Sequence, residues 1–320
     1  MPPQHTIILK NGLKLFTTFS NYEQRLVYPS SVVIRPWKRV IFLLHGFPDN
    51  HETFNEVWDL ILNSYQNEPV LLLAPALRGY EPSSFADSDK EYHTIDIAGD
   101  VKSWISSIVP EDEHENIPVH LVGHDWGACV SFQTANLYPE LITLMVTMAI
   151  PYCVNLGVWE YLLYAPMQVY CSSYFFTMQF ASMYRPRFAM TETGKNSYLD
   201  KLYRYWSPKW DYTEADIGSV RNTLNTKGVI DAVTAYYRCF ISLRTLSNRW
   251  YVDFNKVPTL ILGGADDGCM HKLLWEYEAK KLAGVSNVKV TLLKGLGHFL
   301  HREDPKKVAD HITDWLQIHA

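Results

Sequence analysis

Residues 118–128 read PVHLVGHDWGA and decide the fold class of this chain. The apolar run up to Val122 is typical of a buried strand, and the residues after Asp125 are typical of a helix. Gly123 and Gly127 flank Asp125, and glycines at these places permit a sharp strand-to-helix turn that lifts the middle side chain out of the sheet. We therefore predict a nucleophile elbow with Asp125 at its tip. In the simpler alternative, Asp125 only caps the helix that follows it.

Short apolar runs alternate with amphipathic stretches on both sides of this turn. Such alternation is typical of a mostly parallel sheet that is covered by helices on both faces. The expected strands are residues 6–10, 13–18, 40–44, 70–74, 119–122, 144–148, 259–262 and 289–292. The expected helices are residues 52–64, 95–108, 126–137, 271–282 and 305–318, the last with Asp304 as its N-cap. We therefore expect an α/β protein with a mostly parallel central sheet flanked by helices.

The alternation stops between about residues 151 and 248, where aromatic residues and helical patterns follow one another without strands. We interpret this stretch as an inserted helical cap. The predicted domains are a core of residues 1–150 and 249–320 and a cap of residues 151–248.

Residues 156–184 are the most membrane-like part of the chain. Glu160, Gln168 and Gln179 interrupt them, so no apolar run of about 18 residues remains to span a bilayer. We expect these residues to form buried cap helices and expect no stable membrane insertion. Contact with a membrane surface is the less favoured interpretation.

The composition argues against several classes of protein. Hydrophobic residues make up 47% of the 320 residues and charged residues 20%, which favours a large folded core over disorder. The net charge is −5 and no segment is rich in Lys or Arg, so we expect no nucleic-acid partner. The five cysteines form no CxxC pair, and we expect neither a metal nor a cofactor. The first residues lack the pattern of a signal peptide, so we expect a cytoplasmic protein.

Two later segments supply partners for Asp125. A nucleophile elbow is followed along the chain by an acid and then by a histidine. His298 lies between glycines and just after an expected strand, so its ring can reach the same edge of the sheet. The acid is Asp267 or its neighbour Asp266 in the glycine-rich loop 263–268, and we favour Asp267 from the spacing of the turn. We interpret four other histidines as structural or as supporting residues behind the site: His45, His51, His124 and His301.

The segment His45-Gly46-Phe47-Pro48 follows another expected strand. A backbone N–H after the glycine can point into the site, so the N–H groups of Phe47 and Trp126 are predicted to form an oxyanion hole. We also expect Trp126, Phe47 and Pro48 to contact the substrate.

The motifs HGFP (45–48), GHDWG (123–127), GADDG (264–268) and GLGHF (295–299) together resemble the epoxide hydrolase branch of the α/β-hydrolase superfamily. That branch is related to haloalkane and fluoroacetate dehalogenases. The resemblance covers nearly the whole chain and implies an α/β-hydrolase fold with an inserted cap. It further implies that a small, apolar, epoxide-like substrate is opened to a vicinal diol through an ester on Asp125. His298, oriented by Asp267, would then activate water.

The resemblance also implies two cap tyrosines that hold and protonate the epoxide oxygen. In the family, the second of them lies in a helix beside an aromatic residue and before Arg, which matches Tyr237 better than Tyr236. The first lies a few residues ahead of a hydrophobic residue and Gln, which matches Tyr174, with Tyr170 as the alternative. Aromatic packing under a helical lid would equally account for tyrosines here.

The chain departs from the family pattern in residues 75–81, where Ala76 and Glu81 replace the usual Asp and Gly. This puts the shape of that loop in doubt.

Two rival functions remain open. A haloalkane dehalogenase needs two N–H donors for the halide; Trp126 supplies one, and the second would come from Trp159, Trp206 or Trp210. Fluoroacetate dehalogenases carry Arg where this chain has Trp126. A ligand-binding protein without turnover is the other rival, because a fold does not guarantee an activity.

Overall fold

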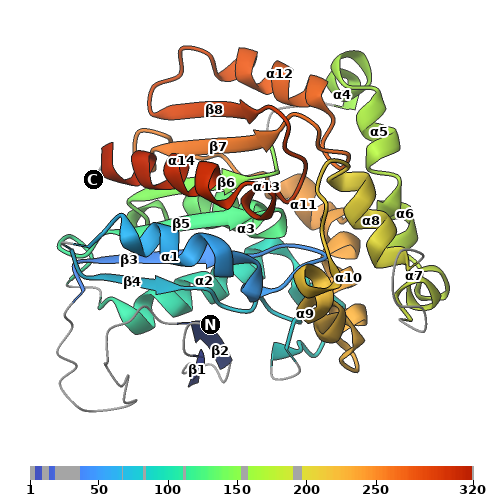
Figure 1. The fold of residues 1–320 in the computed structure, drawn as a ribbon, viewed down its shortest axis with the longest axis horizontal. Helices are drawn as coiled ribbons and strands as arrows, with labels where there is room; N and C mark the ends of the chain where they lie inside the picture. Colours follow the sequence, from blue (N-terminus) through green and yellow to red (C-terminus); the bar gives the residue numbers. More distant parts are fainter. Residues whose placement is uncertain are drawn as a thin grey trace.

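The computed structural model describes residues 4–8, 14–18, 37–66, 68–81, 84–110, 113–152, 158–189 and 197–318. Six strands form a parallel sheet in the order β4-β3-β5-β6-β7-β8 (Figure 1). They are β3 (Arg39–Leu44), β4 (Val70–Leu73), β5 (Val119–His124), β6 (Leu144–Met148), β7 (Thr259–Gly264) and β8 (Val288–Leu293). The expected α/β architecture with a parallel central sheet is thus confirmed.

The first two strands do not join this sheet. Within the described residues, β1 (Gln4–Ile8) and β2 (Lys14–Thr18) pair antiparallel with each other as a separate two-stranded sheet. Strand β1 lies two residues earlier than predicted, and residues 9, 10 and 13 of the predicted strands fall outside the described part.

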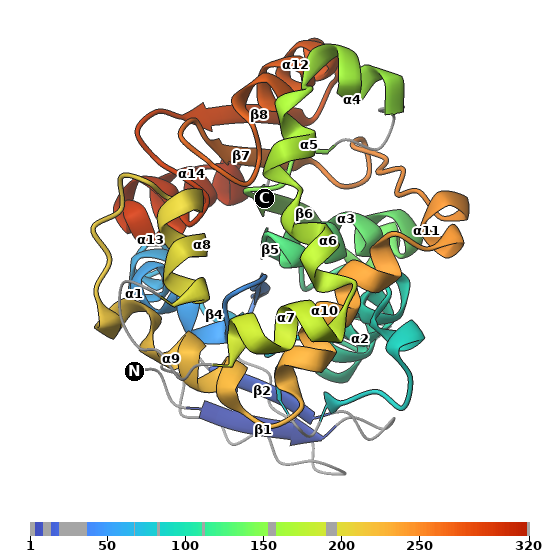
Figure 2. The ribbon, with the colours of Figure 1, turned by 90° about the vertical axis from the view of Figure 1, so that its right-hand side faces the viewer.

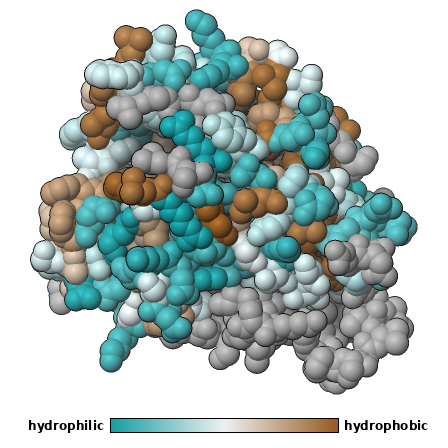
Figure 3. Space-filling view, turned by 180° about the vertical axis from the view of Figure 1, so that it is seen from behind, coloured by the Kyte–Doolittle hydropathy of each residue, from teal (hydrophilic) through white to brown (hydrophobic). Residues whose placement is uncertain are grey.

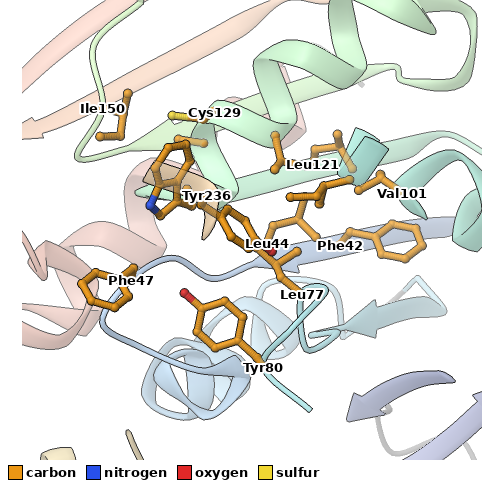
Figure 4. Packing of buried hydrophobic residues seen from close by; sticks show 14 of the residues in the cluster. Phe42, Leu44, Phe47, Leu77, Tyr80, Val101, Leu121, Cys129, Ile150 and Tyr236 are labelled. Atoms are coloured by element: carbon orange, nitrogen blue, oxygen red, sulfur yellow. The ribbon is translucent and has the colours of Figure 1, made fainter. Parts of the chain in front are cut away.

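Helices cover both faces of the sheet. Alternate residues of each strand point to opposite sides, and apolar residues occur at both sets of positions, so both faces need to be covered. Ile41 and Leu43 of β3 belong to a core under α1 (Asn55–Asn63) and α14 (Pro305–Ile318). Phe42 and Leu44 belong to the larger core under α2 (Thr94–Ile108), α3 (Trp126–Leu137) and α12 (Lys272–Leu282). Figure 4 shows the side chains of Phe42 and Leu44 near Leu77 in the larger core.

The helix boundaries agree with prediction to within one residue, except at the start of α1. The predicted helix 52–64 begins as a 3-10 turn (His51–Phe54), because the Asn50 side chain accepts a hydrogen bond from the N–H of Glu52 and caps that turn. Asp304 caps α14 as predicted, since its carboxylate accepts the N–H of Lys307 at 3.1 Å. Further short elements of the core are η3 (Asp89–Tyr92), η5 (Pro139–Leu141) and α13 (Leu300–Glu303).

Eight helices connect β6 to β7 in the described residues, and they lie beyond the carboxyl ends of the strands (Figures 1 and 2). They are α4 (Val158–Tyr164), α5 (Met167–Cys171), α6 (Tyr174–Met178), α7 (Ala181–Phe188), α8 (Tyr198–Trp206), α9 (Glu214–Asn225), α10 (Val229–Phe240) and α11 (Leu243–Ser247). We call them the inserted helices. The division into core and cap domains at residues 151 and 248 remains a prediction.

The expectation that residues 156–184 are buried is wrong for α4, α5 and α6. Trp159 is 82% exposed, Leu163 71% and Phe176 62%. These helices pack on the rest of the molecule by one face only, and the other face is also apolar. Among the described residues, no helix has both the length and the apolar character needed to cross a bilayer.

Four cysteines are buried with free thiols, and Cys153 lies outside the described residues. The four are Cys129, Cys171, Cys239 and Cys269.

Candidate active site

Asp125 occupies the sharp turn between β5 and α3. Its backbone has φ 50° and ψ −118°, an unusual conformation for a residue other than glycine. The turn passes so close to β3 that a Cβ on Gly127 would lie 1.9 Å from the carbonyl oxygen of Leu44. The Asp125 side chain makes no capping hydrogen bond to its helix and is 3% exposed. The alternative that Asp125 is only a helix cap is therefore wrong.

The Asp125 carboxylate meets the segment that follows β3. The N–H of Phe47 donates to Oδ1 of Asp125 at 2.7 Å. Gly46 permits this approach, since a Cβ there would lie 2.4 Å from Cβ of Asp125. Trp126 is the first residue of α3, so its N–H has no acceptor within the helix. The two N–H groups named from the sequence thus belong to residues beside this carboxylate.

His298 lies between Asp125 and the loop 265–271, which follows β7 and precedes α12. We call this loop, which carries Asp267, the acid loop. Its Nε2 lies 3.4 Å from Oδ2 of Asp125, and its Nδ1 lies 2.9 Å from Oδ2 of Asp267. An ionised carboxylate can only accept a hydrogen bond. Nδ1 of His298 therefore carries a hydrogen and is the donor in this bond. The other oxygen of Asp267 accepts the N–H groups of Cys269 and Met270 at 2.6 and 3.0 Å. Asp266 points elsewhere and pairs with Lys209 at 2.9 Å.

The backbone of His298 is held from two sides. Its N–H donates to the carbonyl oxygen of Trp206 on α8 at 3.0 Å. Its own carbonyl oxygen accepts Nε2–H of His124 at 2.9 Å. Glu303 also accepts the N–H of Gly297 at 2.9 Å. Sequence reasoning missed Trp206 and Glu303, since neither lies in a recognisable motif.

The charges around His298 set it apart from its neighbours. Burial by itself lowers the pKa of His298, but the carboxylates of Asp267 and Asp125 raise it to about 10. Burial lowers the pKa of His45 and of His124 to about 3. It also holds the pKa of His301 well below its usual value. His298 is thus the histidine of this group that holds a second proton at neutral pH, whereas the other three stay neutral.

A cavity of about 560 Å³ opens above Asp125, between the sheet and the inserted helices. Apart from the carboxylate, its wall is mostly aromatic and aliphatic, which suits an apolar ligand. Ile150 and Cys129, both in its wall, are labelled in Figure 4. The lining residues are Asp125, Trp126, Cys129, Ile150, Pro151, Tyr161, Gln168, Val169, Ser172, Tyr174, Phe175, Tyr237, Phe240, Ile241, Trp250, Met270 and Leu274.

Phe47 and Pro48 are not among these lining residues, although we expected them to contact the substrate. The ring of Phe47 is fully buried and packs edge-on against Phe188 and Tyr237. The carbonyl oxygen of Pro48 accepts the hydroxyl of Tyr203 at 2.8 Å. The inserted helices therefore cover both residues. Trp126, by contrast, does line the cavity.

Two of the four tyrosines considered from the sequence reach the cavity. Tyr174 and Tyr237 both line it, with ring centroids 5.6 Å apart. Tyr170 is 63% exposed, and Tyr236 donates its hydroxyl to the carbonyl oxygen of Arg78 at 2.7 Å. Packing among the inserted helices therefore decides which of these tyrosines line the cavity.

The two cavity tyrosines are suited to donate protons. Burial raises the pKa of Tyr174 and of Tyr237 well above 10, so both keep their protons. The Tyr174 hydroxyl lies 3.5 Å from Sγ of Cys269. The Tyr237 hydroxyl is buried beside the Trp126 ring, and no described residue gives it a hydrogen bond of ordinary geometry.

A polar side chain that sequence reasoning did not assign to the site joins α5 to the acid loop. Gln168 is 4% exposed, and its amide nitrogen donates to the carbonyl oxygen of Cys269 at 2.9 Å. Its amide oxygen accepts the N–H of His271 at 2.8 Å. Gln168 thereby ties the cavity wall to the loop that carries Asp267.

The unusual loop 75–81 is nevertheless well anchored. The Arg78 guanidinium makes two hydrogen bonds to Asp100, at 2.7 and 2.5 Å. The Tyr80 hydroxyl donates to the carbonyl oxygen of Gly46 at 3.0 Å. Ala76 and Glu81 therefore leave the loop attached to the segment that holds Asp125.

Two buried groups of side chains have the spacing of metal ligands, with ligand atoms within 4.8 Å of one another. In the first group, Asp267 and His298 are already bonded to each other. The second consists of Asp49, His124 and His301, and the positive charge of Arg302 acts on both Asp49 and His301. This charge opposes a further cation, so we assign no metal to the second group, and in the first group Asp267 and His298 already bind each other.

The sequence matches the family described as "alpha/beta hydrolase fold" over residues 39–305. Epoxide hydrolase 4 of Mus musculus is 24% identical over 287 residues, which cover 88% of this chain and 73% of that protein. Among solved structures, a variant of epoxide hydrolase from Solanum tuberosum has a TM-score of 0.72 at 20% identity and covers 99% of this chain and 100% of its own. The epoxide hydrolase of Bacillus megaterium in complex with an inhibitor has the same TM-score at 21% identity and covers 98% and 100%.

These comparisons confirm the resemblance to epoxide hydrolases that the four motifs predicted. Together with the strand order and the match over most of its length, they show that the chain belongs to the α/β-hydrolase fold family.

Proposed function

We propose that this protein is an enzyme that hydrolyses apolar epoxides to vicinal diols, with Asp125 as the nucleophile. One observation carries the proposal: a buried carboxylate forms the floor of an apolar cavity whose wall holds two protonated tyrosines. An electrophile that needs both a nucleophile and a proton donor for its leaving oxygen fits this arrangement. Epoxide hydrolases among the relatives support the same activity.

In the first step, Oδ2 of Asp125 attacks an epoxide carbon, and the bond from that carbon to the ring oxygen breaks. Oδ1 is the oxygen that accepts the N–H of Phe47, so it becomes the carbonyl oxygen of the ester. The released oxygen takes a proton from Tyr174 or Tyr237 and becomes a hydroxyl. The product of this step is a hydroxyalkyl ester on Asp125 and a tyrosinate.

In the second step, His298 removes a proton from water, and the hydroxide attacks the ester carbonyl. Part of the high pKa of His298 comes from the charge of Asp125, and ester formation removes that charge. The pKa of His298 therefore falls, so Nε2 gives up its proton through solvent to the tyrosinate and becomes the base that removes a proton from water. The N–H groups of Phe47 and Trp126 stabilise the oxyanion, and its collapse releases the diol and restores Asp125. His298 keeps the proton taken from water and so ends the cycle protonated, as it began, and the balance is epoxide plus water to diol.

The haloalkane dehalogenase alternative has weaker support. None of Trp159, Trp206 and Trp210, from which the second halide donor was expected, is among the residues that line the cavity. Trp159 is 82% exposed. The position after Asp125 carries Trp126, not the Arg of fluoroacetate dehalogenases.

The test is a panel of styrene-type, fatty-acid and small aliphatic epoxides beside haloalkanes, with diol and halide release both measured. We expect diol from apolar epoxides and no halide from the haloalkanes. Halide release at a comparable rate would replace the proposal with the dehalogenase. If no substrate turns over and no covalent adduct can be trapped on Asp125, the protein is a binding protein that kept the fold.

Three further expectations stay predictions: the cytoplasmic location, the absence of a nucleic-acid partner and the extent of the cap domain. The inserted helices support the last of these, because they form one wall of the cavity and the core forms the other.

A further inference from the structure

The outer surface of α4, α5 and α6 is apolar and exposed. We call it the apolar face and define it by Trp159, Leu163, Met167, Val169, Tyr170 and Phe176, which are between 49% and 82% exposed. The three helices follow one another along the outer side of the inserted helices (Figure 2). In the view from behind, the inserted helices lie toward the left, and this side of the molecule carries brown and tan side chains (Figure 3). Apolar surface gathered in this way usually marks a contact site.

The apolar face also lacks charge. Between residues 159 and 184, Glu160 is the one charged residue. It accepts the Tyr277 hydroxyl at 2.8 Å and lies 3.5 Å from the Lys281 ammonium, so its charge is compensated from α12. Beyond the face, α7 adds the exposed side chain of Arg187. A neutral surface of Trp, Tyr and aliphatic residues with a cation at its border is typical of proteins that lie on lipid.

The mouth of the cavity opens within this surface. Val169 lines the cavity and is also 59% exposed, and Ile241, which lines the cavity too, is 61% exposed. A protein partner or a second copy of the chain seated on the apolar face would close this entrance. A fluid lipid surface would leave it open to any apolar molecule dissolved in the lipid.

From this geometry we infer that the apolar face docks on the surface of a lipid bilayer, with α4, α5 and α6 in the interfacial region. Docking would bring the cavity mouth against the lipid, so that an apolar epoxide passes from the bilayer to Asp125 without crossing water. Docking itself is independent of the reaction, whereas this delivery of substrate rests on the proposed function.

The first experiment is co-sedimentation of the purified protein with phosphatidylcholine vesicles, with and without phosphatidylserine. The double variant Trp159→Ser, Leu163→Ser removes apolar surface from the face and changes no residue of the cavity wall. Its matched control is Val285→Ser, Ile318→Ser, which removes two exposed apolar side chains that belong neither to the apolar face nor to the cavity wall. We expect the wild type and the control to bind vesicles alike and the double variant to bind at least about tenfold more weakly.

The inference is overturned if the wild type does not bind vesicles, or if the control loses as much binding as the double variant. It is also overturned if ultracentrifugation shows a wild-type dimer that the double variant cannot form and vesicles bind neither, because a second copy then covers the face. Sedimentation needs no turnover, so docking is tested even if the proposed function fails.

Kinetics test the delivery of substrate. With a water-soluble epoxide, the wild type and the double variant should turn over at the same rate. With a long-chain epoxide dissolved in vesicles, the double variant should be several-fold slower. Equal rates on both substrates would contradict delivery from the lipid.

Discussion

The carboxyl edge of the sheet and the inserted helices contribute to the same cavity in different ways. At the sheet edge, Asp125, Asp267 and His298 each follow a strand, and backbone contacts as close as that of Gly127 with Leu44 hold them. Tyr174 and Tyr237 instead lie on helices whose position depends on aromatic packing. We infer that bond-making groups occupy the rigid part of the molecule, whereas groups that recognise and protonate the substrate occupy the more adaptable part.

Several hydrogen bonds join these regions, and two of the connections reach the residues beside Asp267 and His298. The carbonyl oxygen of Trp206 on α8 accepts the N–H groups of Gly268 and His298, at 3.1 and 3.0 Å. Gln168 on α5 holds the loop after Asp267. The inserted helices therefore help to position the core residues. Substitutions at the sheet edge and in the inserted helices test separately what each region contributes.

Removal of the nucleophile should have the largest effect. In Asp125→Ala no ester can form, so we expect diol formation to fall by at least ~10⁴-fold. The matched control is Asp266→Ala, which removes a carboxylate of the acid loop that pairs with Lys209 outside the site. Its rate should stay within a few-fold of wild type. Steady-state assays of diol decide the matter, and near-normal turnover by Asp125→Ala would refute the proposed mechanism.

Removal of the base should stop the reaction halfway. In His298→Gln the epoxide can still open on Asp125, but the ester has no group to activate water. Intact-protein mass spectrometry should show an added mass equal to that of the substrate, with one equivalent of epoxide consumed per protein molecule and no diol released. An unmodified protein after long incubation would mean that His298 acts before the ester forms.

On the helix side, loss of one proton donor should cost less. Tyr174→Phe and Tyr237→Phe should each lower kcat by about 10²-fold, because general acid catalysis contributes on that scale. Tyr170→Phe is the control, since Tyr170 is exposed, and its kcat should not change measurably. If Tyr174→Phe and Tyr170→Phe behave alike, Tyr174 serves packing and not proton transfer.

The smallest effect concerns stability and its pH dependence. The pKa of His298 is about 10 in the folded protein and 6.5 in its unperturbed state. Its contribution to the free energy of unfolding is therefore complete below pH 6.5 and is lost as pH rises toward 10. His298→Gln should flatten the decline of wild-type stability over this window, as measured by urea unfolding at several pH values. An unchanged slope would show that the two carboxylates do not hold a proton on His298.

Local chemistry made much of this protein predictable. The alternation of apolar runs predicted the six parallel strands, and a carboxylate before Pro305 predicted the cap of α14. The glycines around Asp125 predicted its turn, because a backbone this crowded excludes other residues. In each case the sequence signal lies within a few residues of the feature it predicts, even where the contact that requires it, such as that of Gly127 with Leu44, is distant in the sequence.

Packing between distant segments decided the rest. Asp266 and Asp267 are adjacent in sequence, as are Tyr236 and Tyr237, and only contacts with other elements direct one member of each pair to the site. The same holds for Phe47, which is covered by Phe188, and for α4 to α6, which we expected to be buried. Hydrophobicity in a sequence shows that a side chain avoids water, whereas the surface that covers it is a property of the assembled fold.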